Sequence, residues 1–148
     1  MTAGRVRLLL VTLWVGSLWT VGYVVAPTLF ATLADKVLAG TIAGKLFRIE
    51  AWLTVGCAVA LIALIKWLPD ERGTKAGKHL VWLILGMLGC TLVGYFGLQP
   101  FMSALREAAA GGMMDPDAKS RFGLLHGVSS AFYLIQSLLG GLLVWKLR

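Results

Sequence analysis

The chain has 148 residues, of which 58% are hydrophobic and 14% are charged, and this composition excludes an ordinary soluble globular protein. A formal net charge of +7 would suggest nucleic acid binding in a soluble chain, but here Lys and Arg flank long apolar runs. Anionic lipid headgroups explain the positive charge better, so we expect an integral membrane protein with no nucleic acid partner.

Four apolar runs predict four transmembrane helices. They cover about residues 8–34, 50–68, 78–102 and 122–145. As a helix, the first run is about 40 Å long and exceeds a hydrocarbon core of roughly 30 Å. We therefore expect an all-α fold, an integral membrane four-helix bundle in which residues 1–148 form a single transmembrane domain.

The segments between the runs differ in character. Residues 35–49 mix three cations with apolar positions at helical spacing, which predicts an interfacial helix that either stands alone or continues into the second span. Residues 70–78 are too few for anything except an antiparallel hairpin. Residues 103–121 form the longest polar stretch, expected as a loop after a short helical continuation.

Small residues recur at helical spacing in two of the runs. Thr12, Gly16 and Thr20 follow i, i+4, i+8 in the first run. Gly86, Gly89 and Gly94, with Cys90 and Gly97, share one face of the third. Such faces let helices approach closely in a membrane, so both are predicted packing faces.

A short motif suggests an internal repeat. The triplet Val21–Tyr23 recurs as Val93–Tyr95, and each copy is followed by a proline, Pro27 or Pro100. A tandem repeat of two helical hairpins is one interpretation of this pattern. It predicts that the first two spans superpose on the last two about a pseudo-two-fold axis along the membrane normal. The central glycines of the two triplets should then lie at matching depths and each face another helix.

The distribution of Lys and Arg predicts the orientation in the membrane. Eight of these residues lie on the side of the termini and of the central connection, and six lie on the opposite side. This bias predicts that both termini and the short central connection lie in the cytoplasm. The expected location of this multi-pass protein is the bacterial inner (cytoplasmic) membrane.

Polar side chains gather where spans one and three end and spans two and four begin. Along the fourth span they form one stripe. Polar side chains that face lipid are energetically costly, so the stripe is expected to point into the bundle. Interhelical hydrogen bonding and a functional cavity remain two alternatives for it. The candidate pocket consists of His126, Ser129, Ser130, Tyr133, Gln136, Glu50, Gln99, Tyr23 and Tyr95.

Glu50 and the two histidines are the strongest candidates for chemistry. Glu50, near Arg48 and opposite Arg121, is expected in an ion pair at the headgroup level rather than as an acid catalyst. His79 and His126 begin different spans on opposite faces, so one haem cannot bind both.

The cofactor expectation is therefore none, and haem b is the alternative. In that case the metal ligand would be His126, with Met102, Met113, Tyr95 or nothing as the second ligand. The sequence has no nucleophile triad, phosphate loop or nucleotide fingerprint, which favours a non-enzymatic role.

Three segments resemble the transmembrane-protein-205-like family, a bacterial and eukaryotic membrane domain of unknown function: residues 39–47 (AGTIAGKLF), residues 121–130 (RFGLLHGVSS) and residues 22–30 with their Ala-Pro-X-X-Phe. The resemblance implies a four-helix membrane protein without established catalytic residues. More distantly, the chain resembles the copper-resistance protein D and membrane protoporphyrinogen oxidase families, which implies metal or tetrapyrrole handling.

The sequence thus predicts a small polytopic membrane protein with a polar inter-helix pocket toward the extracytoplasmic face, and a haem- or metal-handling redox protein as the alternative. The expected partner is the lipid bilayer. A second copy of the chain or a membrane-complex subunit is the other partner that the glycine faces would fit.

Overall fold

The computed structural model describes residues 3–68, 73–108 and 115–147, with the backbone alone for residues 73–76. The chain forms α1 (Ala3–Trp19), η1 (Thr20–Val25), α2 (Ala26–Thr32), α3 (Lys36–Trp67), α4 (Gly73–Thr91), η2 (Leu92–Gly97), α5 (Gln99–Ala108) and α6 (Pro116–Leu147). The two η elements are single π-helical stretches, and no strand occurs among the described residues.

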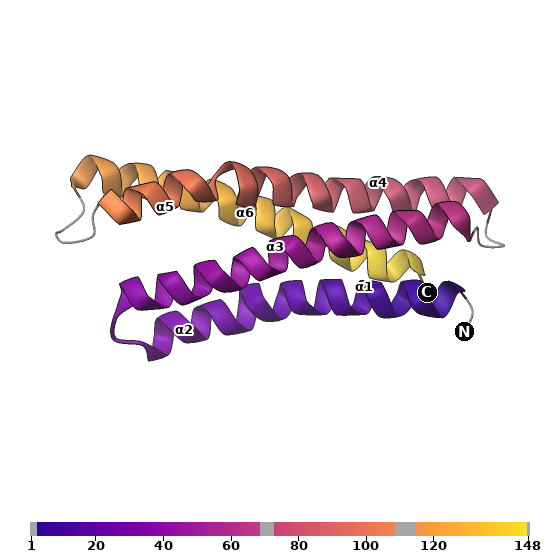
Figure 1. Ribbon diagram of the computed structural model, residues 1–148, viewed down its shortest axis with the longest axis horizontal. Coiled ribbons are helices and arrows are strands. Elements are labelled where there is room, and N and C mark those ends of the chain that lie inside the picture. The colour runs from indigo at the N-terminus through magenta and orange to yellow at the C-terminus, as the bar shows by residue number, and fades with distance from the viewer. Residues whose placement is uncertain (1–2, 69–72, 109–114, 148) are drawn as a thin grey trace.

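These elements make four long rods that run up and down the bundle (Figure 1). The rods that are long and apolar enough to cross a membrane are Ala3–Thr32, Lys36–Trp67, Gly77–Ala108 and Pro116–Leu147. The predicted fold class, an all-α membrane four-helix bundle, is confirmed. The start of α1, the end of α3, the start of α4 and the end of α6 lie at one end of the bundle, which we call the terminal end (Figure 1).

The helices extend beyond the predicted spans. Asp35 starts α3 early, because its Oδ1 accepts hydrogen bonds from the backbone N–H groups of Val37 (2.8 Å) and Leu38 (3.1 Å). Residues 36–49 therefore continue into the second span as one helix. Pro116 starts α6, at a position where a missing N–H costs nothing.

The hydrophobic core lies toward the terminal end. Its fully buried large side chains come from all four rods: Trp14, Leu18, Leu61, Ile84, Met87 and Leu143. Arg7 is buried at this end and donates hydrogen bonds to the carbonyl oxygens of Leu64 (2.9 Å) and Leu68 at the end of α3. Because the last carbonyls of a helix lack intrahelical partners, this cation fastens the first rod to the second.

The opposite end of the bundle, which we call the open end, is looser. There α2 and the first half of α3 diverge from α5 and the first half of α6 (Figure 1). Many large apolar side chains point outward along the whole bundle, including Leu9, Leu13, Val59, Trp82 and Leu138. Such a surface fits a lipid bilayer, which the sequence predicted as the partner.

The predicted packing faces have different outcomes. A Cβ atom on Gly86 would come within 3.2 Å of Leu139, and one on Gly94 within 3.2 Å of Phe132, so these two positions of the third rod pack against α6. Gly89 has no atom within 4 Å of such a position and Gly97 meets only its own rod, so these other glycines of the predicted face do not. Gly16, however, has no atom within 4 Å of such a position, and Thr12 and Thr20 are exposed. The stripe on the first rod is therefore not a packing face within the described bundle.

The internal repeat is visible in the helix conformation. η1 and η2 occupy equivalent positions, 72 residues apart, and the following helices each carry proline as their second residue. Gly22 faces Tyr133 and Gly94 faces Phe132, which confirms that each glycine faces another helix. Both contacts are made with α6. A two-fold axis between the halves would place them on different helices, so the side-chain contacts do not follow the repeat.

Candidate functional site

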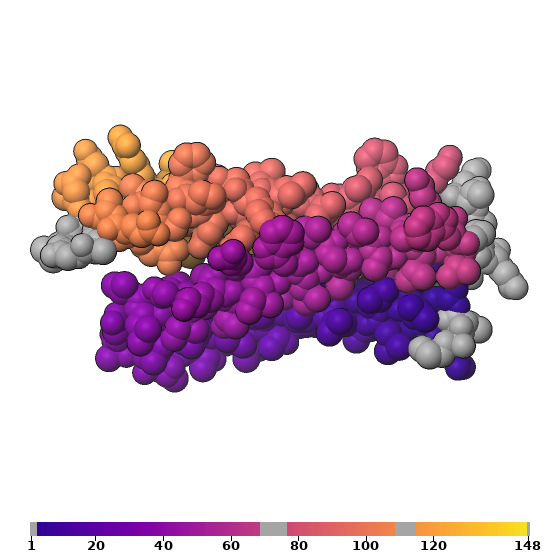
Figure 2. All heavy atoms as spheres, in the orientation of Figure 1, coloured from indigo at the N-terminus to yellow at the C-terminus, as the bar shows by residue number. Residues whose placement is uncertain are grey.

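A cleft with a volume of about 790 Å³ separates the two hairpins at the open end. On α3 it is lined from Lys36 to Thr54, a distance of about 27 Å along the helix at 1.5 Å per residue. Its inner end is at mid-bundle, and its outer end lies between α2 and α5. Figure 2 shows the surface hollowed between the purple residues of α3 and the orange residues of α5.

All nine residues of the candidate pocket line this cleft: His126, Ser129, Ser130, Tyr133, Gln136, Glu50, Gln99, Tyr23 and Tyr95. They come from all four rods, and Tyr23 and Tyr95 lie in the two π-helical stretches. The structure therefore brings together residues that are up to 113 positions apart, from Tyr23 to Gln136.

Two hydroxyl groups of the polar stripe bond to the backbone at the π-helical stretches. Tyr133 donates to the carbonyl oxygen of Leu18 (2.5 Å), and its hydroxyl also interacts with the Gly22 backbone. Ser129 donates to the carbonyl oxygen of Gly94 (3.1 Å). A side chain that inserts into the i to i−4 hydrogen-bond ladder widens a helix locally, which accounts for a π-helical turn at each place.

The inner end of the stripe also bonds to side chains of other helices. Tyr23 donates to Ser137 Oγ (2.9 Å), and the amide of Gln136 lies 3.4 Å from Thr54 Oγ1. Trp14 Nε1 donates to the same Thr54 hydroxyl at 2.8 Å. For this part of the stripe, interhelical hydrogen bonding holds the bundle together.

The outer end of the stripe makes no such bonds in the part of the chain that the structure describes. Ser130 donates to the carbonyl of His126 in its own helix (2.8 Å). The His126 ring stacks on Phe122, with 6.1 Å between the centroids and 5° between the planes. His126 is exposed on the cleft wall, ten residues into α6, and no hydrogen bond of its imidazole is found among the described residues.

The prediction that Glu50 forms an ion pair with Arg48 or Arg121 at the headgroup level is wrong. Glu50 lies at the middle of α3 and is 4% exposed, whereas Arg48 and Arg121 are both exposed. Residues two apart on a helix point about 200° apart, so Arg48 cannot follow Glu50 into the interior. Among the described residues, Glu50 has no ion pair, and its hydrogen-bond donor is Ser17 (3.2 Å).

The outer end of the cleft is basic. Arg106 donates to the carbonyl oxygen of Gly40 (3.1 Å), and its guanidinium lies 5.7 Å from the centroid of Phe122. Its Nε is buried without a hydrogen-bond partner among the described residues. Lys36 donates to the carbonyl oxygens of Phe30, in the last turn of α2, and of Leu33, the residue that follows α2.

Sequence reasoning missed Thr54, Phe47 and Arg106 as cleft residues. Phe47 and Thr54 lie three positions before and four positions after Glu50, so helical spacing from Glu50 could have found both. Arg106 gave no such signal, because its place depends on where α5 packs.

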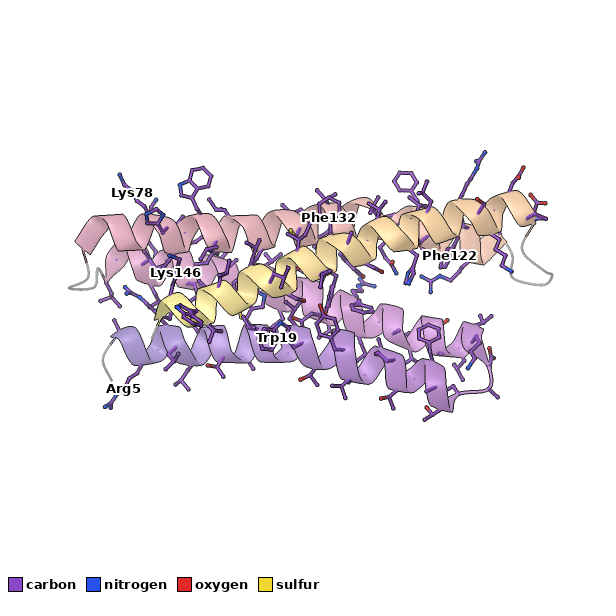
Figure 3. All side chains as sticks on the ribbon, turned by 180° about the vertical axis from the view of Figure 1, so that it is seen from behind. Arg5, Trp19, Lys78, Phe122, Phe132 and Lys146 are labelled. Carbon is purple, nitrogen blue, oxygen red and sulfur yellow. The ribbon has the colours of Figure 1, made fainter. Side chains whose placement is uncertain are left out.

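The two histidines lie at different ends. His79 follows Lys78, which stands at the same end as Lys146 and Arg5 in Figure 3, while Phe122, the stacking partner of His126, is at the opposite end. Met102 and Tyr95 line the cleft with His126; Met113 lies outside the described residues. No group of three or more His, Cys, Asp or Glu that could hold a metal ion occurs in the described segments.

A model of the family "Domain of unknown function (DUF4149)" matches residues 9–110, which is more than half of the chain. The chain belongs to the DUF4149 family. No curated protein and no solved structure matches it significantly. In this DUF4149 member the family region includes Tyr23, Glu50, Tyr95 and Gln99, while α6 with His126 follows it. None of these findings names the transmembrane-protein-205-like family, so that resemblance remains a prediction.

Proposed function

We propose that this DUF4149 chain is a multi-pass protein of the bacterial inner membrane that binds a small amphipathic molecule in the cleft and catalyses no reaction on it. The observation that carries the proposal is the cleft itself. Its volume of about 790 Å³ is in the range of ligand sites, and it combines apolar walls with a few buried polar groups.

The walls of the cleft favour a ligand that arrives from the bilayer. Phe30, Val37 and Leu134 line the cleft and are 43%, 72% and 53% exposed. Apolar side chains at the edge of a cleft in a membrane protein meet lipid rather than water. A molecule that partitions into the bilayer can therefore enter sideways between the two hairpins.

The polar groups of the cleft favour binding over catalysis. Glu50 and His126 are the acidic group and the imidazole of the cleft. They make no contact with each other in the described structure. Glu50 lies at the inner end, and His126 lies on the exposed wall. General acid–base catalysis needs such groups within hydrogen-bonding reach of one reacting centre.

We also propose that the cleft opens toward the extracytoplasmic side. The eight Lys and Arg residues of the terminal end against six at the open end support this orientation. It would expose the ligand site to the outer leaflet of the membrane.

A pair of glycine substitutions on α3 tests the binding proposal. Gly44 lines the cleft near Gln99, whereas Gly56 is exposed with no atom within 4 Å of an added Cβ. Gly44→Leu should fill the cleft, and Gly56→Leu is the matched control. We expect Gly44→Leu to release small molecules that copurify with the wild-type protein in mild detergent, as measured by mass spectrometry of extracts. Equal recovery from wild type and both variants would contradict the proposal.

Haem binding is the second candidate function, because His126 lies on the cleft wall with Met102 and Tyr95 while its imidazole has no hydrogen bond among the described residues. His126 would be the axial ligand, and the haem would supply electron transfer. A Soret band with near-stoichiometric iron in the purified protein, lost in His126→Ala, would support this function. Its absence after expression with excess haem would exclude it.

A further inference from the structure

We infer that Glu50 binds the positive charge of the ligand, so that the molecule held in the cleft is a lipophilic organic cation. The inference rests on the proposed binding function and adds the chemical class of the ligand. Three independent features of the inner end of the cleft carry it.

The first feature is an incompletely bonded carboxylate. Glu50 lines the cleft yet is only 4% exposed. An ionised carboxylate offers about four acceptor sites, and in the part of the chain that the structure describes Ser17 is the donor that fills one of them, at 3.2 Å. Acidic groups inside a membrane protein normally pair with a cation or face a polar pathway, because an unpaired charge there is costly.

The second feature is the aromatic surround of Glu50. Phe47 lies one turn away on the same face of α3, and its ring packs edge-on against Tyr133, with 5.4 Å between centroids. Tyr133 packs edge-on against Tyr23 at 6.2 Å. Faces of aromatic rings attract organic cations, especially when water is excluded.

The hydroxyl groups of these tyrosines reinforce the preference for a cation. Tyr133 donates its proton to the Leu18 carbonyl and Tyr23 donates its proton to Ser137. Both protons are therefore already used within the protein. An anionic ligand at this depth would find no free hydroxyl donor from these rings. The Lys and Arg side chains that line the cleft in the described structure, Lys36 and Arg106, lie at its outer end.

The third feature is the separation of charge along the cleft. Arg106 bonds to Gly40, which is ten residues, or about 15 Å, from Glu50 along α3. Lys36 bonds to the end of α2, still farther out. The basic residues that line the cleft thus lie at the outer end. They do not pair with the carboxyl group of Glu50 at the inner end, which leaves this group for a ligand.

Two ions of nearly equal shape and opposite charge test the inference. Binding of tetraphenylphosphonium, tetraphenylborate and neutral triphenylphosphine oxide to the full-length protein in lipid nanodiscs should be measured by equilibrium dialysis. We expect tetraphenylphosphonium to bind most tightly. Glu50→Gln should weaken its binding by more than about tenfold, because a buried charge pair loses one partner. Binding of the neutral probe should stay unchanged, and binding of tetraphenylborate should not weaken, because the substitution removes a charge that repels it.

Two further variants control this measurement. Glu107→Gln removes an exposed carboxylate on α5 and should leave all three affinities unchanged. Glu50→Asp keeps the charge and should retain part of the binding that Glu50→Gln loses. A uniform loss in Glu50→Gln, for all three probes, would show damage to the cleft and overturn the inference.

A wild-type measurement keeps the inference testable if Glu50→Gln does not fold. Dicyclohexylcarbodiimide reacts with carboxyl groups in apolar surroundings, and mass spectrometry locates the adduct. Tetraphenylphosphonium should protect Glu50 from this reaction, and tetraphenylborate should not. Equal protection by both ions, or none, would overturn the inference.

The outcomes also separate this inference from the function on which it rests. If tetraphenylborate and the neutral probe bind as tightly as the cation, and Gly44→Leu blocks them, the cleft is a binding site but Glu50 does not select the charge. If none of the three probes binds, the binding function loses its support as well.

Discussion

The ring of Tyr133 lies against the backbone of Gly22, so closely that a Cβ atom on this glycine would come within 2.2 Å of the ring carbon Cε1. The Tyr133 hydroxyl meanwhile donates to the carbonyl of Leu18, one turn earlier in the same rod. Gly22 and Leu18 are i and i−4 partners in an ordinary α-helix. The contact therefore joins the fourth rod to the first and lies where the first becomes π-helical.

Gly22→Ala should destabilise the bundle. The added methyl group would displace the Tyr133 ring and break its hydrogen bond, at a cost of about 1–3 kcal/mol. Gly16→Ala, in the same rod but with open space around it, is the matched control and should leave stability unchanged or slightly raised. Reversible unfolding in mixed detergent micelles measures both. Equal stability of the two variants would show that the tyrosine contact does not restrict position 22.

Tyr133→Phe should keep the packing but remove the hydroxyl from the Leu18 carbonyl. The expected loss is about 1 kcal/mol, typical of one hydrogen bond. Combined with Gly22→Ala, the two losses should be less than additive, because both substitutions break the same bond. A double-mutant cycle provides this comparison. If the two losses in the free energy of unfolding are strictly additive, Gly22→Ala does not act by breaking the hydrogen bond of Tyr133.

Thr54→Val should leave the buried indole N–H of Trp14 without its acceptor at the inner end of the cleft. An unsatisfied buried donor costs about 1–3 kcal/mol. Thr41→Val, in the same helix but exposed and bonded only to the carbonyl of Val37, is the control and should have a much smaller effect. Thermal unfolding followed by circular dichroism measures the difference. The prediction fails if Thr41→Val lowers the melting temperature as much as Thr54→Val.

Reporter fusions test the orientation. A fusion after Lys75, between the second and third rods, should report the cytoplasm, and one after Gly112, between the third and fourth, should report the exterior. The expectation follows from the excess of Lys and Arg at the terminal end. Reports from the same side would contradict the four-span topology, and opposite reports in the reverse order would place the cleft toward the cytoplasm.

The amino-acid sequence by itself determined that the chain lies in a lipid bilayer, where its helices occur, and at which end of the bundle the polar residues gather. Run length, composition and the alternation of direction along the chain are local or additive properties, so they do not require knowledge of partners. Because successive spans run in opposite directions, Tyr95 and Gln99 at the end of the third span and His126 at the start of the fourth were expected at the same end of the bundle. The triplet at Val21–Tyr23 also marked, through its copy, where the two π-helical stretches occur.

Only the tertiary structure decided the depth of Glu50 and the division of the polar stripe. Glu50 lies at mid-bundle because Asp35 starts α3 and no residue between them interrupts the helix, and Ser17 then meets it from another rod. Tyr133 donates a hydrogen bond to the first rod, whereas the His126 side chain forms none with the described residues, because only the inner part of α6 reaches the first rod. Gly22 and Tyr133 are 111 residues apart, and no periodicity in a single helix encodes which neighbour it meets.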